Sequence, residues 1–363
     1  MNDKLNPGLE GVVVADSHLS YIDGNDGVLV IAGYDIAELA QEHTVEDICA
    51  LLWTGNLPDA DARMNLQQQL ASGRRAAFDM LPELGNALIR DDGMSALRAS
   101  LAQLPEASPA HIVGATATFA AAWWRGRIGE QAIAPDERLD HARDYYRMAR
   151  GGIADDDAAR AMSRYLVTVA DHGMNASTFT ARTVASTGSD DVSAVVAALG
   201  ALKGPLHGGA PGPVLDMIGE IATAERAEPW LRERIRNKER IMGMGHRVYR
   251  VRDPRAAVFE EAAIELNSGR IELARHIERV AERLLTERHP GRTLRANVEF
   301  YTAVLLDALG LAPAQFAPTF AVGRVVGWCA HIAEQRRTGR LIRPRARYVG
   351  PTPDRRAAQP SSS

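Results

Sequence analysis

The stretch "DVSAVVAALGALKGPLHGGAPGP", residues 191–213, changes character halfway along. Its first part, residues 191–203, carries apolar residues on one helical face. These residues are Val195, Val196, Leu199 and Leu202. Its second part sets His207 among four glycines and three prolines, which interrupt helices and strands. The stretch therefore predicts a helix, followed either by an ordinary loop or by a loop whose backbone closely approaches a ligand.

The same alternation of helix and breaker continues along most of the chain. Residues 35–53 are expected to form two helices, with Thr44 and Asp47 in capping-box spacing. Further helices are expected at about 157–171, 228–241, 254–267, 271–288, 296–309 and 319–337. The clearest strand signals are residues 11–17 and 27–34, which predict a small hairpin or edge ribbon. The pattern therefore predicts an all-α protein with a small N-terminal β ribbon.

Length and composition place the chain among soluble globular proteins. It has 363 residues, of which 46% are hydrophobic and 24% charged. That length exceeds the size at which a single hydrophobic core usually stops growing, so two domains are expected. The net charge of −4 gives no support for nucleic-acid binding.

Cysteine usage and the terminal residues predict a cytoplasmic protein. Cys49 and Cys329 lie far apart in apolar stretches and are expected to be buried free thiols of a reducing compartment. No signal-peptide pattern begins the chain, and the longest apolar run, residues 194–202, is too short to span a bilayer.

Three histidines have a glycine as a direct neighbour. His172, His207 and His246 all occur in such surroundings, which allow a ligand to reach both ring and backbone, and together they indicate a shared site. A metal centre is the alternative, but no pair has H-x-x-x-H or HExxH spacing. The "GMG" of 243–245 does not continue as a dinucleotide-binding pattern.

Arginines gather next to one of these histidines. Residues 247–255 contain four arginines and one acid, which indicates either a solvated basic face or a site for small carboxylates or phosphates. Arg324 interrupts the apolar run "FAVGRVVGWCAHIAE", so we expect it to face an acidic side chain or a bound anion. The segment "RLIRPRARYVG", residues 340–350, could dock on a surface while presenting guanidinium groups.

Glu299 stands at the start of an apolar helix, in "RANVEFYTAVLLDALG". A carboxylate there can simply favour the helix dipole. In a closed cavity it can instead remove a proton from a carbon acid.

Five stretches together carry a resemblance to a known family. They are "DHGMNASTFTAR", "GPLHGGA", "GMGHRVYRVRDPRA", "NVEFYTAVLLDALG" and "FAVGRVVGWCAHIAEQ". In order and spacing the chain resembles the citrate synthase family, from "GLEGVVVADS" to "RPRARYVG". The resemblance implies a homodimer of almost entirely helical subunits. It also implies a large domain, residues 1–207 and 305–363, and a small domain on the acyl-coenzyme A side, residues 208–304.

The resemblance also implies a role for each matching residue. His207 would stabilise the thioester enol, His246 would polarise the keto group of oxaloacetate, and Glu299 would be the catalytic base. Oxaloacetate would be held by His172, Arg255, Arg324 and, from the neighbouring subunit, Arg343. Coenzyme A would be contacted by Gly243, Gly245 and Arg247. No metal and no tightly bound cofactor are expected.

The expected reaction is the condensation of acetyl-coenzyme A with oxaloacetate to citrate, a step of the tricarboxylic acid cycle. Two alternatives stay open: a 2-methylcitrate synthase that uses propionyl-coenzyme A, and a catalytically silent paralogue that binds acyl-coenzyme A. One methylene in an apolar pocket changes binding by only about 1–3 kcal/mol, so sequence does not separate the two enzymes. The chain departs from the family's usual residues at three places. Glu299 stands where the family usually has aspartate. Pro211–Gly212 replaces a common Asn–Glu pair, and Gly173–Met174 replaces a common Glu–Gln pair.

Overall fold

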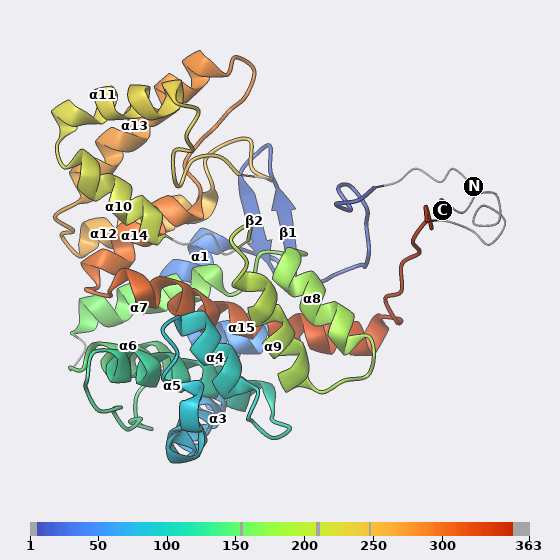
Figure 1. Ribbon diagram of the computed structural model, residues 1–363. Helices are drawn as coiled ribbons and strands as arrows, with labels where there is room; N and C mark the ends of the chain where they lie inside the picture. The colour runs from blue at the N-terminus through green and yellow to red at the C-terminus, as the bar shows by residue number, and fades with distance from the viewer. Residues whose placement is uncertain (1–5, 153–154, 208–210, 247, 351–363) are drawn as a thin grey trace, which may run out of the picture.

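The computed structural model describes residues 6–152, 155–207, 211–246 and 248–350. Across these ranges the chain forms fifteen α-helices, two short 3-10 helices and one three-stranded antiparallel sheet (Figure 1). The first helices are α1 (Ile36–Glu42), α2 (Val45–Thr54), α3 (Ala60–Asp79), α4 (Gly93–Leu101), α5 (Pro109–Arg127), α6 (His141–Arg150), α7 (Asp156–Val169) and α8 (Ala176–Ala185), with η1 (Leu81–Glu83) and η2 (Gly85–Ala87) between α3 and α4. The others are α9 (Asp191–Leu202), α10 (Gly212–Ile221), α11 (Ala224–Arg236), α12 (Pro254–Glu265), α13 (Ile271–Arg288), α14 (Val298–Ala308) and α15 (Pro313–Thr338). The mainly helical fold with a small ribbon is therefore confirmed.

Helix α15 crosses the middle of the helical body and packs against α5, α7, α8 and α9 (Figure 1). Apolar residues occur all round it, so it is buried along most of its length rather than along one stripe. It begins six residues before the predicted residue 319, because Pro313 is suited to the first helical position. Pro318 lies inside the helix.

A glycine sets how closely α15 approaches the end of α7. A Cβ atom on Gly327 would lie 2.2 Å from the carbonyl oxygen of Ala170 and 2.9 Å from Oδ1 of Asp171. No side chain fits at that spacing. The crossing therefore fixes the backbone that leads directly into His172.

Of the two predicted strands, the one at 27–34 is confirmed, whereas its partner lies later in the chain than the predicted 11–17. β1 (Ser20–Asp23) pairs with β2 (Val28–Ile31), and β2 pairs with the short β3 (Tyr34–Asp35). The expected strand at 11–17 was wrong: Val13 is 84% exposed there, whereas Leu29 in β2 is fully buried. Asp23 ends β1 because its carboxylate accepts the backbone N–H groups of the turn.

Most of the predicted helices are confirmed to within a few residues. The Thr44–Asp47 capping box separates α1 from α2 as expected. The prediction at 228–241 was displaced: α11 ends at Arg236, and Lys238 then adopts a left-handed backbone with φ of 60°. Cys49 and Cys329 are both buried and free.

Helices α10 to α14 lie together at one end of the molecule (Figure 1). There α11 packs on α13, and α14 packs on α10 and α12. Among the described residues no one helix has the length and apolarity to cross a bilayer; α14 and α15 meet those criteria only as a pair bent by 111°.

The glycine at the α7–α15 crossing generates a stability prediction. We expect Gly327→Ala to lower the free energy of unfolding by about 1–3 kcal/mol, because the added methyl group meets backbone that cannot move aside. Gly219→Ala is the matched control: this glycine lies in α10 with open space around its Cβ, so alanine should raise stability by about 0.5–1 kcal/mol. Urea denaturation of both variants measures the difference, and equal effects would contradict the packing argument.

Candidate active site

The structure brings two of the predicted histidines together. His172 follows α7, and His246 lies in the loop between α11 and α12. Their ring centroids are 5.6 Å apart in an edge-on arrangement. Tyr249 contacts both rings, with centroid distances of 4.8 Å to His246 and 5.6 Å to His172.

His246 has a defined proton position. Its Nδ1 accepts hydrogen bonds from the backbone N–H groups of Val248 (3.0 Å) and Tyr249 (3.1 Å). Because a backbone N–H can only donate, the proton of the neutral ring must be on Nε2. Burial, assisted by the charge of Arg255, lowers the pKa of His246 to about 4. The ring is therefore neutral at pH 7 and offers one N–H donor.

His207 accepts a backbone N–H on the other ring nitrogen. Its Nε2 accepts the backbone N–H of Ser177 at 3.2 Å, in the first turn of α8. The proton of the neutral ring is therefore on Nδ1, and the positive end of α8 disfavours a second proton. Burial, together with Arg324, lowers the pKa of His207 to about 4. The Ser177 hydroxyl also contacts Nε2 at 2.8 Å and accepts the indole N–H of Trp328 at 3.2 Å.

Asn297 joins the loop of His246 to the helix of Glu299. Its backbone N–H donates to the carbonyl of Gly243, and its side-chain amide donates to the carbonyl of Gly245, both at 2.9 Å. Its Oδ1 accepts the backbone N–H of Glu299, which starts α14. Both glycines have positive φ, and a Cβ on Gly243 would lie 2.9 Å from Cβ of Phe300. These glycines therefore let the loop lie directly against α14.

Glu299 lies at the start of α14 and is partly buried. Burial raises the pKa of its carboxyl, while the charges of Arg240 and Arg255 oppose that rise. A carboxylate with a raised pKa is a stronger base than one in water.

Two arginines are buried close to these groups. The guanidinium of Arg255 binds both carboxylate oxygens of Asp253, at 3.0 and 2.8 Å. Arg324 donates from Nε to the carbonyl of Val169 at 2.6 Å, and its guanidinium lies 4.7 Å from the Phe320 ring centroid. Its Nη2 is buried and has no hydrogen-bond partner among the described residues. Burial, with Arg255 adding to it, lowers the pKa of Arg324 to about 10.

The unpartnered Nη2 bears on the two expectations for Arg324. No carboxylate forms an ion pair with it in the described part of the chain, so the expected acidic partner is not found there, and a bound anion stays the expectation. The charge of Arg255 acts on Arg324 as well, and the positive potentials of the two guanidinium groups add, which favours a bound anion.

Other predicted basic residues have different surroundings. Arg252 is paired with Glu278 and Glu260, each at 2.7 Å, so it stabilises the packing of α12 and α13. Arg343 is exposed on the segment after α15, and the structure does not bring it to the histidines. That segment is attached to the body where the Ser186 hydroxyl accepts the backbone N–H of Ile342 at 3.1 Å. Arg247 lies outside the described residues.

A buried polar chain that the sequence did not single out begins at Asp171, directly before His172. Asp171 accepts the backbone N–H of Gly173 and faces Nε2 of His331 at 3.1 Å. His331 Nδ1 accepts from Arg182 at 3.1 Å, and Arg182 pairs with Glu334 at 2.6 Å. Burial would raise the pKa of Asp171, but His331 and Arg324 lower it to about 2. All of these residues lay inside the quoted stretches, yet only the fold shows their contacts.

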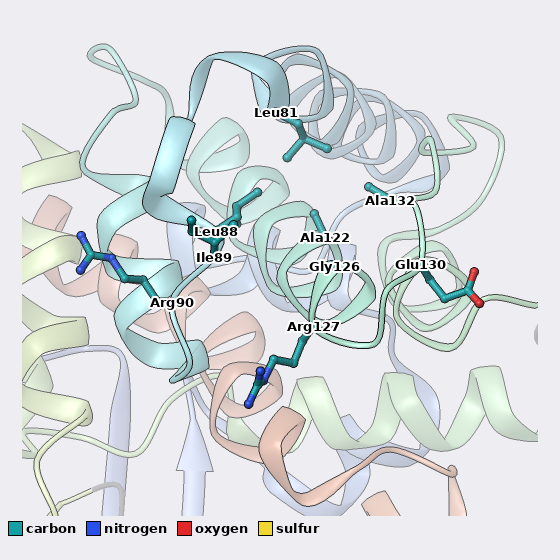
Figure 2. A pocket seen from close by; sticks show the side chains of 9 residues that line it. All are labelled: Leu81, Leu88, Ile89, Arg90, Ala122, Gly126, Arg127, Glu130 and Ala132. Carbon is teal, nitrogen blue, oxygen red and sulfur yellow. The ribbon is translucent and has the colours of Figure 1, made fainter.

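One surface hollow lies away from these residues. It measures about 350 Å³ and is lined by parts of α5 and by segments 81–90 and 130–132 (Figure 2). None of the predicted site residues lines it, so the site is recognised by its donors and charges rather than by cavity size. No cluster of three or more potential metal ligands occurs among the described residues.

Comparisons with known sequences point to one family. The sequence profile of the family described as "Citrate synthase, C-terminal domain" matches residues 8–345. The citrate synthase of Deinococcus radiodurans is 36% identical, covering 94% of this chain and 95% of that protein.

Solved structures of the same family share the fold of this chain. The citrate synthase of Thermotoga maritima superimposes with a TM-score of 0.86 at 32% identity, covering 96% of each chain. The Thermoplasma acidophilum enzyme, solved as a ternary complex with carboxymethyl coenzyme A and oxaloacetate, gives a TM-score of 0.87 at 29% identity, covering 96% of this chain and 97% of that one. The chain belongs to the citrate synthase family.

Proposed function

We propose that this enzyme condenses acetyl-coenzyme A with oxaloacetate and hydrolyses the product thioester to citrate and coenzyme A. One observation carries the proposal: His207 and His246 are neutral rings whose free N–H positions are fixed by backbone donors. A shared site is supported by the charges of two buried arginines: Arg324 acts on His207, and Arg255 acts on both His246 and Glu299. A base, two oxygen-directed donors and an anion site are the groups that this condensation requires.

In the first step the Glu299 carboxylate takes a proton from the methyl group of the acyl thioester. The Nδ1–H of His207 donates to the thioester oxygen and stabilises the enol that forms. In the second step the enol carbon attacks the keto carbon of oxaloacetate, whose oxygen receives a hydrogen bond from Nε2–H of His246. Donors aimed at developing oxyanion charge commonly contribute about 3 kcal/mol each. Water then cleaves the thioester.

Arg255 and Arg324 suit the carboxylates of oxaloacetate. Arg255 already neutralises Asp253, while Arg324 retains one unsatisfied buried N–H group. A dianion bound here would satisfy that group and offset the repulsion between the two guanidinium groups. His172, next to His246, would help to hold the same substrate.

Coenzyme A would enter from the small domain, here residues 208–304, and closure of that domain on the large one would exclude water. Gly243, Gly245 and Arg247 are the proposed contacts. Both glycine carbonyls already accept hydrogen bonds from Asn297, so what supports the proposal is the position of their loop beside Glu299.

We further propose a homodimer in which Arg343 completes the neighbouring site. The segment after α15 runs away from the helical body (Figure 1) and exposes apolar residues such as Leu341 (59%) and Val349 (86%). Such a segment gains from burial against a second copy of the chain. The two buried free thiols fit a reducing cytoplasm.

The function is tested by the release of free coenzyme A thiol in the presence of oxaloacetate. A higher kcat/KM with acetyl- than with propionyl-coenzyme A supports the citrate synthase assignment, whereas the reverse order assigns the methylcitrate reaction. His207→Ala should lower kcat by about 100- to 1,000-fold, because one oxyanion donor is removed. Absence of thiol release from folded protein would mean that the chain is a silent paralogue.

The pKa directions predict the acid limb of the pH profile. Activity requires ionised Glu299, whose pKa burial raises above its ordinary value of 4.5. As the pH falls, kcat/KM should therefore decline through that raised pKa before the histidines, at about 4, become protonated. Glu299→Gln should lower kcat by about 100- to 10,000-fold at every pH, while Glu299→Asp keeps a carboxylate and measurable turnover. An acid limb in Glu299→Gln that matches the wild type would contradict the assignment of Glu299.

Mixed dimers test the role of Arg343. Arg343→Ala and His207→Ala should each be nearly inactive as homodimers. After co-refolding at equal amounts, about a quarter of wild-type activity should return, since half of the dimers would be mixed and each mixed dimer has one intact site. Mixing His207→Ala with Glu299→Gln uses two residues of the same subunit's site and should restore nothing. No recovery in the first mixture would place Arg343 in its own subunit's site or outside the site.

A further inference from the structure

Tyr249 lies between the two histidines proposed to bind oxaloacetate. It is 1% exposed, and its ring contacts both imidazoles. Two of its polar groups reach a histidine: the backbone N–H donates to Nδ1 of His246, and the hydroxyl lies 3.1 Å from Nε2 of His172. No other residue in the described part of the chain hydrogen-bonds to both histidines.

The backbone contact requires no assumption about protons. An amide N–H can only donate, so Nδ1 of His246 accepts and Nε2 carries the proton. This half of the arrangement depends on the backbone and is independent of the tyrosine side chain.

The partners available to the Tyr249 hydroxyl show which group donates in its contact with His172. Nε2 of His172 is the one hydrogen-bond partner of the Tyr249 hydroxyl among the described residues. If His172 donated, the hydroxyl proton would stay buried without an acceptor, which costs about 1–3 kcal/mol. If Tyr249 donates, both groups are satisfied. In that arrangement Nε2 of His172 accepts, and the proton of the neutral ring is on Nδ1.

We propose that Tyr249 is a positioning residue that sets opposite tautomers on the two substrate histidines, Nε2–H on His246 through its backbone and Nδ1–H on His172 through its hydroxyl. The inference rests on the proposed function, in which both N–H groups would donate hydrogen bonds to oxaloacetate. A ring with the wrong tautomer presents a lone pair where the substrate oxygen needs a donor, so the hydroxyl affects binding without touching substrate itself.

The direct test is nitrogen NMR of the ligand-free protein labelled with 15N-histidine, with His172→Gln and His246→Gln used for assignment. We expect Nδ1–H on His172 and Nε2–H on His246 in the wild type. In Tyr249→Phe the His172 signals should move toward the other tautomer or an average, while those of His246 stay unchanged. A wild-type His172 protonated on Nε2, or His172 signals that Tyr249→Phe does not alter, would overturn the proposal.

Kinetics provide the second readout, with Tyr145→Phe as the matched control. Tyr145 is also buried, and its hydroxyl bonds to Thr319 at 2.7 Å rather than to a histidine. We expect Tyr249→Phe to raise KM for oxaloacetate by about 3- to 10-fold, in line with one lost hydrogen bond. KM for acyl-coenzyme A should stay within about twofold, and Tyr145→Phe should change neither. Equal effects of both variants would indicate a purely structural role.

The two proposals fail separately. If the wild type releases no coenzyme A thiol, the proposed function fails, while NMR still decides the tautomers. If turnover is normal but Tyr249→Phe leaves both the NMR signals and KM unchanged, the function stands and the role of Tyr249 is refuted.

Discussion

Two buried guanidinium groups, of which one acts electrostatically on the other, are the constraint on which the proposed site depends. Arg255 has Asp253 as a partner, but Arg324 is almost fully buried and keeps one N–H group unsatisfied. Burying such a group costs free energy, which the apolar contacts of α15 with its neighbouring helices offset. On the proposed function, a bound anion would satisfy this group. The low pKa values of the three nearby histidines follow from the same positive charge together with burial.

A neutral histidine offers a hydrogen-bond donor at a defined ring nitrogen only if its proton position is fixed, and in this site the backbone fixes it. His207 receives the first-turn N–H of α8, and His246 receives two consecutive amides of its own loop. Neither arrangement requires a carboxylate partner, which would raise the histidine pKa and favour the charged ring. Gly245, directly before His246, has a positive φ of 84°, which lets that loop take the shape that brings its amides to the ring.

Helical class, the capping box at Thr44 and the identity of the chemical groups could be predicted from the sequence, because they depend on local spacing and residue type. The first strand was misplaced because Val12–Val14 have strand propensity but are exposed and join no sheet among the described residues. Asp171, Ser177 and Asn297 were missed as supporting residues because their partners lie up to 160 residues away in the chain. Long-range hydrogen bonds leave no periodic signal.

The bonds from Asn297 have a further consequence for motion. This one residue hydrogen-bonds to the carbonyls of Gly243 and Gly245 and to the first turn of α14, so it links the loop of His246 to the helix of Glu299. On the proposed function, domain closure would then carry the proposed base and the proposed keto-group donor together. The same motion would change their separation from His207, on the loop after α9, so the acyl thioester would be held between Glu299 and His207 only in the closed enzyme.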